Sequence, residues 1–256
     1  MKRFTKVCLW IFGVCLVLGL LLVSVSWALG FRGWHPLRRP PLSMEAWNQS
    51  VEGDIRSLRF SVRAGTLVVE EGERFEIVEA ARGTTVESRV ENGVWILEAE
   101  GTGEGSVIGG FAVDNEGIYW KADTGEVHVT IPAGVVLEQA DFSADAGIME
   151  LSGLSCGRMT VDSRAGSVAL SAQVEECLEV FCEMSDVSGV LTGSEYDYRV
   201  DADCSIMGSI TAGSYELGGI GILKDSFARG DEERELKLSC ETGSIELSFS
   251  EEGQEE

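Results

Sequence analysis

Apolar and polar residues alternate along most of the chain after residue 55, and the pattern recurs with a period of about 19–20 residues. The repeats align on one turn position, occupied by Gly125, Gly147, Gly166, Ser185, Ser205 and Gly243. Alternate residues of a strand face opposite sides, so each repeat predicts a strand, a tight turn and a second strand with one buried face. The last two turn positions are 38 residues apart, which we interpret as a repeat near Leu223 that has lost its signature.

Four columns of this alignment carry the pattern. Seven residues before the turn stand Ile118, Ala140, Met159, Leu178, Tyr198 and Leu236. Five before stand Trp120, Phe142, Val161, Val180, Val200 and Leu238. Three before stand the small residues Ala122, Ala144, Ser163, Cys182, Ala202 and Cys240. Two after stand Val127, Met149, Val168, Val187, Met207 and Ile245.

A repeat of about 20 residues cannot bury its own apolar face, but repeats stacked about 4.8 Å apart would bury a continuous core. The pattern therefore predicts an all-β domain over residues 55–250, built as a β-solenoid or β-helix-like stack of 19–20-residue rungs. An antiparallel sandwich of hairpins is the alternative. Upstream, residues 56–100 also alternate but show no clear register, and we expect the first strands and a cap there.

The first part of the chain has a different character. Residues 7–31 form an uncharged, mostly apolar run, long enough to cross a bilayer as one helix. We predict a membrane anchor there, with a cleaved signal peptide as the alternative. Residues 1–6 would be a short basic cytoplasmic head, and residues 32–54 a proline-containing stalk. The predicted location is the plasma membrane, single-pass, with the C-terminal domain extracytoplasmic; the acidic tail, residues 251–256, is expected to be disordered.

The net charge of the chain limits the kinds of molecule that it can bind. The chain carries 43 acidic and 20 basic residues, a net charge of −23, and every acidic residue follows Arg39. With 14 basic residues left after that point, residues 40–256 carry −29. A body of this charge should repel nucleic acid and anionic lipid.

One column of the alignment is rich in carboxylates. Two residues before the turn stand Asp123, Asp145, Arg164, Glu183, Asp203 and Glu241. Stacked repeats would bring neighbouring members within about 5 Å, where they repel unless Arg164 or a divalent cation intervenes. The acidic members Asp123, Asp145, Glu183, Asp203 and Glu241 are therefore candidate ligands of a low-affinity Ca²⁺ or Mg²⁺ ladder. The alternative is a solvated face of a highly acidic protein.

The sequence offers few other residues for metal binding, catalysis or disulfide bonds. The two histidines, His35 and His128, cannot build a histidine-based metal site, and no catalytic or cofactor-binding motif is present in the sequence. The five cysteines after the apolar run are an odd number, which argues against a closed disulfide framework. Cys156 and Cys177, 21 residues apart, are the one pair that the alignment suggests for a bridge.

The segments TGEVHVTIPAG, AGSVAL and TGSIEL, behind a basic head and one apolar run, resemble a bacterial family of β-strand-repeat proteins usually labelled "putative adhesin", which includes LiaG-like envelope proteins. The likeness covers roughly residues 55–249, and the chain departs from it at Ser185, at Ser205 and around residues 218–233. The resemblance implies a β-solenoid outside the plasma membrane, an envelope-associated or stress-related role and no established enzyme activity. No functional residue carries over from it.

The sequence thus favours a membrane-anchored, non-enzymatic binding or scaffold module at the bacterial cell envelope. Its partners would be the bilayer, through residues 7–31, and a wall polymer or an envelope protein. One alternative is a polysaccharide-acting β-helix enzyme that uses carboxylates or Ca²⁺. Another is an accessory protein of envelope-stress signalling.

Overall fold

We describe a computed structural model of the chain, covering residues 44–81, 84–101, 107–108, 111–114, 117–120, 125–218, 223–228 and 234–250. The basic head, the predicted membrane helix, the first part of the stalk, Asp123 and the acidic tail lie outside these residues. Within them, no helix has the length and apolar character to span a membrane. The described chain is almost entirely β, apart from the short 3₁₀ helix η1, Glu195–Asp197.

The chain forms two units, a large one and a small one. The small unit contains a three-stranded antiparallel sheet. Its strands are β6 (Val107–Ile108), β7 (Phe111–Asp114) and β8 (Gly117–Trp120).

The large unit contains an 11-stranded sheet, with β1, β3, β9, β2, β10, β14, β11 and β12 in spatial order. In addition, β4 pairs with β5, β5 with β2, and β13 with β11. The strands are β1 (Met44–Ser50), β2 (Ser57–Gly72), β3 (Glu76–Ala81), β4 (Thr84–Glu91), β5 (Val94–Gly101), β9 (Glu126–Pro132), β10 (Val136–Thr192), β11 (Tyr198–Ala212), β12 (Tyr215–Gly218), β13 (Leu223–Ala228) and β14 (Arg234–Ser250). β1 occupies the last part of the predicted stalk and pairs antiparallel with β3, so this part belongs to the sheet.

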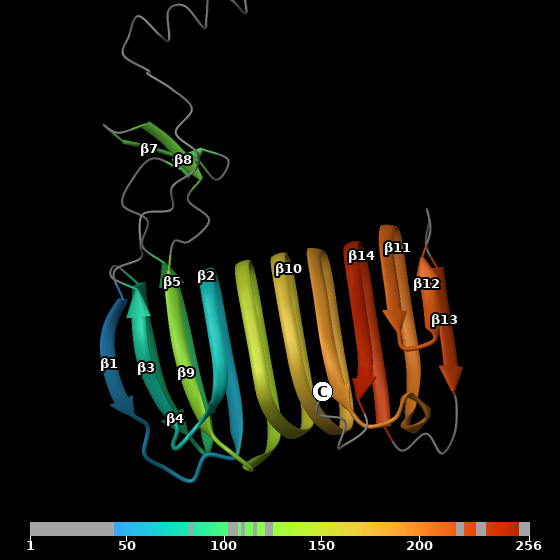
Figure 1. Ribbon diagram of the computed structural model, residues 1–256, viewed down its shortest axis with the longest axis horizontal. Helices are drawn as coiled ribbons and strands as arrows, with labels where there is room; N and C mark the ends of the chain where they lie inside the picture. Colours follow the sequence, from blue (N-terminus) through green and yellow to red (C-terminus); the bar gives the residue numbers. More distant parts are fainter. Residues whose placement is uncertain are drawn as a thin grey trace, which may run out of the picture. The chain divides into compact units, whose positions relative to one another are not determined.

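Parallel, in-register pairing joins the repeats of the large unit. The first repeat of β10 pairs with β2, so that Phe142 lies opposite Phe60. The last repeat of β10 pairs with β14, so that Val180 lies opposite Leu238. Between β2 and β14, the single long strand β10 runs up and down several times, bending at the lower end of the view in Figure 1.

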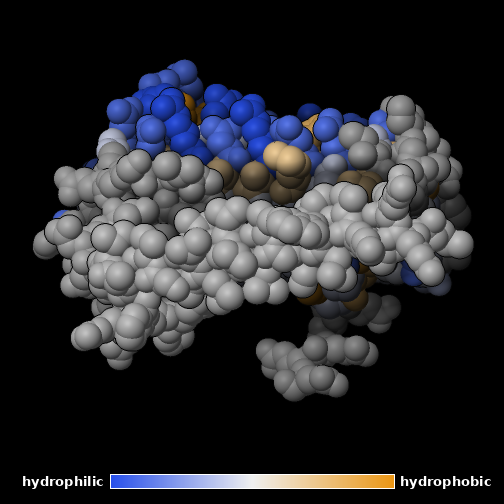
Figure 2. All heavy atoms as spheres, turned by 90° about the horizontal axis from the view of Figure 1, so that it is seen from above, coloured by the Kyte–Doolittle hydropathy of each residue, from blue (hydrophilic) through white to orange (hydrophobic). Residues whose placement is uncertain are grey.

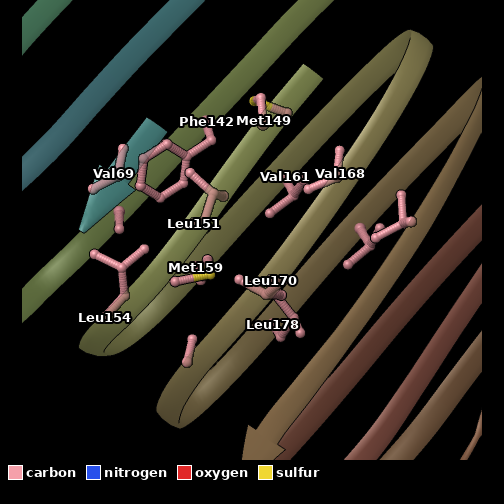
Figure 3. Close-up of a cluster of buried hydrophobic side chains, with 14 of the residues drawn as sticks. Val69, Phe142, Met149, Leu151, Leu154, Met159, Val161, Val168, Leu170 and Leu178 are labelled. Carbon is pink, nitrogen blue, oxygen red and sulfur yellow. The ribbon is translucent and has the colours of Figure 1, made fainter. Parts of the chain in front are cut away.

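The predicted inward columns form the core. Each of the β10 members of the four columns is buried: Ala140, Phe142, Ala144, Met149, Met159, Val161, Ser163, Val168, Leu178, Val180, Cys182 and Val187. Figure 3 shows several of these side chains, including Phe142, Met149 and Val161, gathered between the ribbons. Phe60 lies edge-on to both Trp95 and Phe142, with ring centroids 5.0 and 5.8 Å apart. Apolar burial across successive repeats is the main stabilising term of this unit.

The turn glycines lie directly beside one another. A Cβ atom on Gly147 would overlap the carbonyl oxygen of Gly65, and one on Gly166 would overlap that of Gly147. Gly166 also has a φ of 134°, in the region that favours glycine. The spacing between neighbouring backbones at this corner therefore selects glycine.

The structure corrects the predicted alignment near the C-terminus. β14 lies between β10 and β11, so the order of the repeats in space differs from their order in the sequence. The turn of β11 is at Gly208, opposite Gly243, and not at Ser205. This later turn, together with a one-residue bulge between Cys204 and Met207, moves Val200 and Asp203 out of their predicted columns and leaves Met207 exposed. No repeat is missing near Leu223, because that residue begins β13, which pairs antiparallel with β11.

The alignment is also wrong before Gly125. Ile118 and Trp120 lie in β8 of the small unit, and β5 and β9 together make the repeat that lies beside β2. The turn of β2 is Gly65, in the segment SVRAGTLVV. Along β2, Ala99 of β5 lies opposite Val62, and Glu126 of β9 lies opposite Thr66. Continuing these two registers towards the turn places Gly101 at the position of Ala64 and Gly125 at that of the next residue, Gly65. Residues 102–124 are thus an insertion at the turn of this repeat.

Candidate functional site

The outer surface of the second strand of each repeat forms a groove. Its lining residues stand mostly three to five positions after the turn, in β2, β10, β14 and β11. They are Val68, Glu70, Glu150, Leu151, Ser152, Ala169, Leu170, Ser171, Ser188, Gly189, Val190, Thr211, Gly213, Glu246, Leu247 and Ser248. The groove has a volume of about 920 Å³ and is open to solvent.

Small side chains hollow out this face. Ala169, Ser171 and Ser188 point outward from neighbouring repeats of β10. Gly189 occupies an inward position opposite Leu247, where a Cβ would lie only 2.9 Å from the carbonyl oxygen of Leu170. The groove therefore crosses the strands and follows the direction in which the repeats stack.

The lining combines polar side chains with apolar ones such as Val68, Leu170 and Val190. It offers the hydroxyl groups of Ser152, Ser171, Ser188, Thr211 and Ser248. Three exposed carboxylates, Glu70, Glu150 and Glu246, accompany them. The lining residues of the groove include no lysine, arginine or aromatic residue. Such a surface can exchange hydrogen bonds with hydroxyl or amide groups and would repel an anion.

The outer face of the first strand of each repeat is different, because ion pairs connect neighbouring repeats there. Arg59 lies 3.8 Å from Asp141, and Lys237 lies 2.8 Å from Glu179. The hydrogen bond from Lys237 to Glu179 raises the pKa of the lysine. Exposed pairs of this kind contribute little to stability. Figure 2 shows hydrophilic residues gathered along one border of the molecule, with a smaller group of hydrophobic ones beside them.

The structure keeps part of the carboxylate column together and moves Asp203 out of it. Asp145 pairs with Arg164 at 3.0 Å, as the alignment anticipates for this position. The flanking pairs 182–240 and 184–242 place Glu183 opposite Glu241. Asp203 lies opposite Ser239 instead, because the turn of β11 comes at Gly208, and Asp123 lies outside the described residues. In the part of the chain that the structure describes, no three His, Cys, Asp or Glu side chains form a group that could hold a metal ion.

Two further expectations concern His128 and the cysteine pair. His128 points outward as expected, and its Nε2 atom lies 2.7 Å from Glu126 Oε1. Cys156 is fully buried, whereas Cys177 faces outward beside Glu179, so the two thiols lie on opposite sides of the sheet. The suggested Cys156–Cys177 bridge is therefore wrong.

Sequence reasoning missed the groove and one feature of the cysteines. The signal for the groove was present as small or hydroxyl residues at alternate positions after some of the turns, such as Ala169 and Ser171, but polar outward residues are usual on any sheet. The feature of the cysteines is a row of three buried thiols. The bulge in β11 brings Cys204 beside Cys240, and Cys240 in turn lies beside Cys182. The alignment placed Cys182 and Cys240 in one column but left Cys204 out of it.

Comparison with known proteins supports the fold. No family model matches the chain, and no curated protein is similar to it at a significant level. Among solved structures, a "putative cell adhesion protein" from Clostridium sporogenes is similar over 82% of this chain and 100% of its own, with a TM-score of 0.51 and 12% identity. A "putative adhesin" from Bacteroides fragilis is similar over 80% of this chain and 97% of its own, with a TM-score of 0.33 and 10% identity. The first similarity shows that this chain shares the fold of the C. sporogenes protein.

Proposed function

We propose that the large unit is a β-solenoid that acts as an adhesin-like, non-enzymatic binding module. Two observations support the solenoid: the parallel, in-register pairing of equivalent positions, such as Phe142 with Phe60, and the row of turn glycines. The shared fold with the C. sporogenes protein supports the adhesin-like role, because that protein is described in terms of cell adhesion.

The proposed location is the cell envelope. The apolar run of residues 7–31 would anchor the chain in the plasma membrane, with the acidic body on the extracytoplasmic side. There the module would serve as a scaffold for a wall polymer or an envelope protein. The LiaG-like resemblance is in keeping with this proposal.

The groove is the observation that carries the binding role. Hydroxyl and carboxylate groups recur from repeat to repeat along it, and neighbouring repeats of a parallel sheet are about 4.8 Å apart. A long ligand that lies along the groove would meet a hydroxyl or carboxylate group on every lining repeat, with apolar side chains such as Val68 and Val190 between them. Because the lining has carboxylates and no basic residue, the best match is a neutral, hydroxyl-bearing polymer such as an uncharged wall glycan. Nucleic acid and anionic polymers are poor matches.

The same groove supports a non-enzymatic role. A pair of catalytic carboxylates needs environments that separate the two pKa values, commonly by burying one group. Glu70, Glu150 and Glu246 are all exposed on the outer face, where solvent screens each of them. These residues are therefore better suited to hydrogen-bond a ligand than to protonate a glycosidic bond.

Binding of a neutral wall polysaccharide to the full chain in detergent tests the proposal, measured by calorimetry or co-sedimentation. In Ser171→Arg the long side chain would fill the floor of the groove, and we expect affinity to fall by about tenfold or more, the equivalent of roughly 1.4 kcal/mol. The matched control is Thr160→Arg, which adds the same charge to the other outer face of β10. Equal binding by both variants and the unchanged chain would refute the groove, and release of reducing sugar ends would show an enzyme instead.

A further inference from the structure

Three buried cysteines form a row across neighbouring strands of the large unit. Cys240 of β14 lies opposite Cys182 of β10 on one side and opposite Cys204 of β11 on the other. All three are free thiols in the structure and are almost completely buried, at 1–3% exposure. The central cysteine therefore has a potential partner on each side.

The geometry favours Cys182 as the partner of Cys240. Their Sγ atoms are 3.7 Å apart, and the pairing of β10 with β14 around them is regular. Strands in a sheet are about 4.8 Å apart, which lies within the Cα separation of roughly 4.4–6.8 Å that disulfides use. Bond formation would shorten the Sγ–Sγ distance from 3.7 Å to about 2.05 Å.

Cys204 is the weaker candidate. Its sulfur and that of Cys240 both lie near Gly208, at 2.8 and 3.0 Å from the position of a Cβ on that glycine. However, the register of β11 against β14 shifts immediately after Cys204, where the bulge begins. A bond to Cys204 would have to hold this irregular segment in place, whereas a bond to Cys182 joins two regular strands.

The position of β14 gives such a bond a structural role. β14 is the last strand of the described chain, yet it lies between β10 and β11, which precede it in the sequence. It must therefore enter between two segments that are made earlier. We propose that Cys182 and Cys240 form a disulfide that fixes β14 in this slot, with Cys204 remaining a thiol.

The bond forms by thiol–disulfide exchange with a low-molecular-weight disulfide or with the oxidised, disulfide form of an oxidoreductase. The Cys182 and Cys240 thiols lose two protons and two electrons as the Sγ–Sγ bond forms, and the oxidant's disulfide is reduced to two thiols. Exchange requires a thiolate, and burial raises the pKa of Cys240 to about 12. The exchange therefore takes place while the chain folds, before the thiols are buried.

Oxidative refolding tests the proposal. The full chain, carrying Cys8→Ser and Cys15→Ser, is unfolded with reductant and refolded in detergent with reduced and oxidised glutathione. It is then unfolded and alkylated. We expect three of the five remaining cysteines to react, a mass lower by two hydrogen atoms before alkylation, and a peptide that links Cys182 to Cys240. The closed loop should raise the melting temperature over that of the reduced chain by about 10 °C.

Single variants distinguish the possible partners. Cys156→Ser keeps the linked peptide, whereas Cys182→Ser loses it; circular dichroism of each variant establishes that it has folded. A linked Cys204–Cys240 peptide in the unchanged chain would overturn the proposal, and so would five reactive thiols after refolding. Neither result depends on whether the groove binds a glycan.

Discussion

Gly147 lies so close beside Gly65 in the neighbouring strand that a Cβ on Gly147 would overlap the carbonyl oxygen of Gly65. The two residues are opposite one another in the parallel pair β10–β2. The same relationship recurs between Gly166 and Gly147, so the corner of each repeat is packed against the backbone of the previous one.

This contact predicts how much stability is lost when a methyl group is added to Gly147. Gly147→Ala should lower the free energy of unfolding by about 3 kcal/mol, because the backbone must move to relieve the overlap. Gly134→Ala is the matched control: Gly134 has a φ of 73° but no atom near its Cβ position, so only conformational strain of about 1 kcal/mol is expected. Urea denaturation of both variants measures the difference. Equal losses would mean that the corner is not close-packed.

The aromatic cluster predicts a large effect of truncation. Phe60 is fully buried between Trp95 and Phe142, so Phe60→Ala should destabilise the large unit by about 3–5 kcal/mol. Phe181 points outward and is 44% exposed, so Phe181→Ala should change stability by no more than about 0.5 kcal/mol. Thermal unfolding followed by circular dichroism compares the two. A similar loss in both variants would contradict the inward and outward assignment.

The insertion at residues 102–124 should be removable. Joining Gly101 directly to Gly125 gives this repeat the same length as β2 at Ala64 and Gly65, so the deleted chain should melt cooperatively with a stability within about 1 kcal/mol of the original. Deleting one residue more, 102–125, is the control. It shifts the following strand by one position and would turn Val127 and Val129 outward, so it should be strongly destabilising. The prediction fails if both deletions melt alike.

Buried thiols predict a loss of stability in alkali. Burial raises the pKa of Cys156 to about 12, while in the unfolded chain it titrates near 9. Above that lower value the unfolded state releases a proton that the folded state keeps. The contribution of Cys156 to the free energy of unfolding is therefore fully present below pH 9. It is lost as pH rises from 9 towards 12, at about 1.4 kcal/mol per pH unit. Cys156→Ala should show a shallower fall than the unchanged chain in urea titrations across this range. Parallel pH profiles would argue against it.

The carboxylate column still predicts cation binding, now centred on Glu183 and Glu241. These like charges lie opposite one another, whereas Asp145 is paired with Arg164. Millimolar Ca²⁺ should raise the melting temperature of the unchanged chain, and Glu183→Gln with Glu241→Gln should remove the response. The double variant should itself be more stable by about 0.5 kcal/mol without Ca²⁺, because the repulsion is gone. If Ca²⁺ has no effect on the unchanged chain, the column is a solvated acidic face.

Within the fold, local alternation was enough to predict the repeats of β10. Residues such as Phe142, Val161 and Val180 share a face because side chains alternate along any strand, and the tight corner requires glycine in most repeats. Gly65 could also have been found, since SVRAGTLVV matches the segment DSRAGSVAL around Gly166.

The order of the repeats and the position of the groove could not be predicted this way. Alternation says which residues point inward, but it does not say which strand is the neighbour. A one-residue bulge moves Cys204 beside Cys240, and a 23-residue insertion separates Gly101 from Gly125 without changing the local pattern on either side.

The sequence by itself determined the all-β repeat, its buried columns and its acidic outer surface, because these follow from periodicity and composition. Only the tertiary structure decided that β14 enters between β10 and β11, that three thiols meet, and that residues of β2, β10, β14 and β11 line one groove. The physical reason is that backbone pairing between strands is largely independent of side-chain identity, so the choice of neighbour depends on packing of the whole chain.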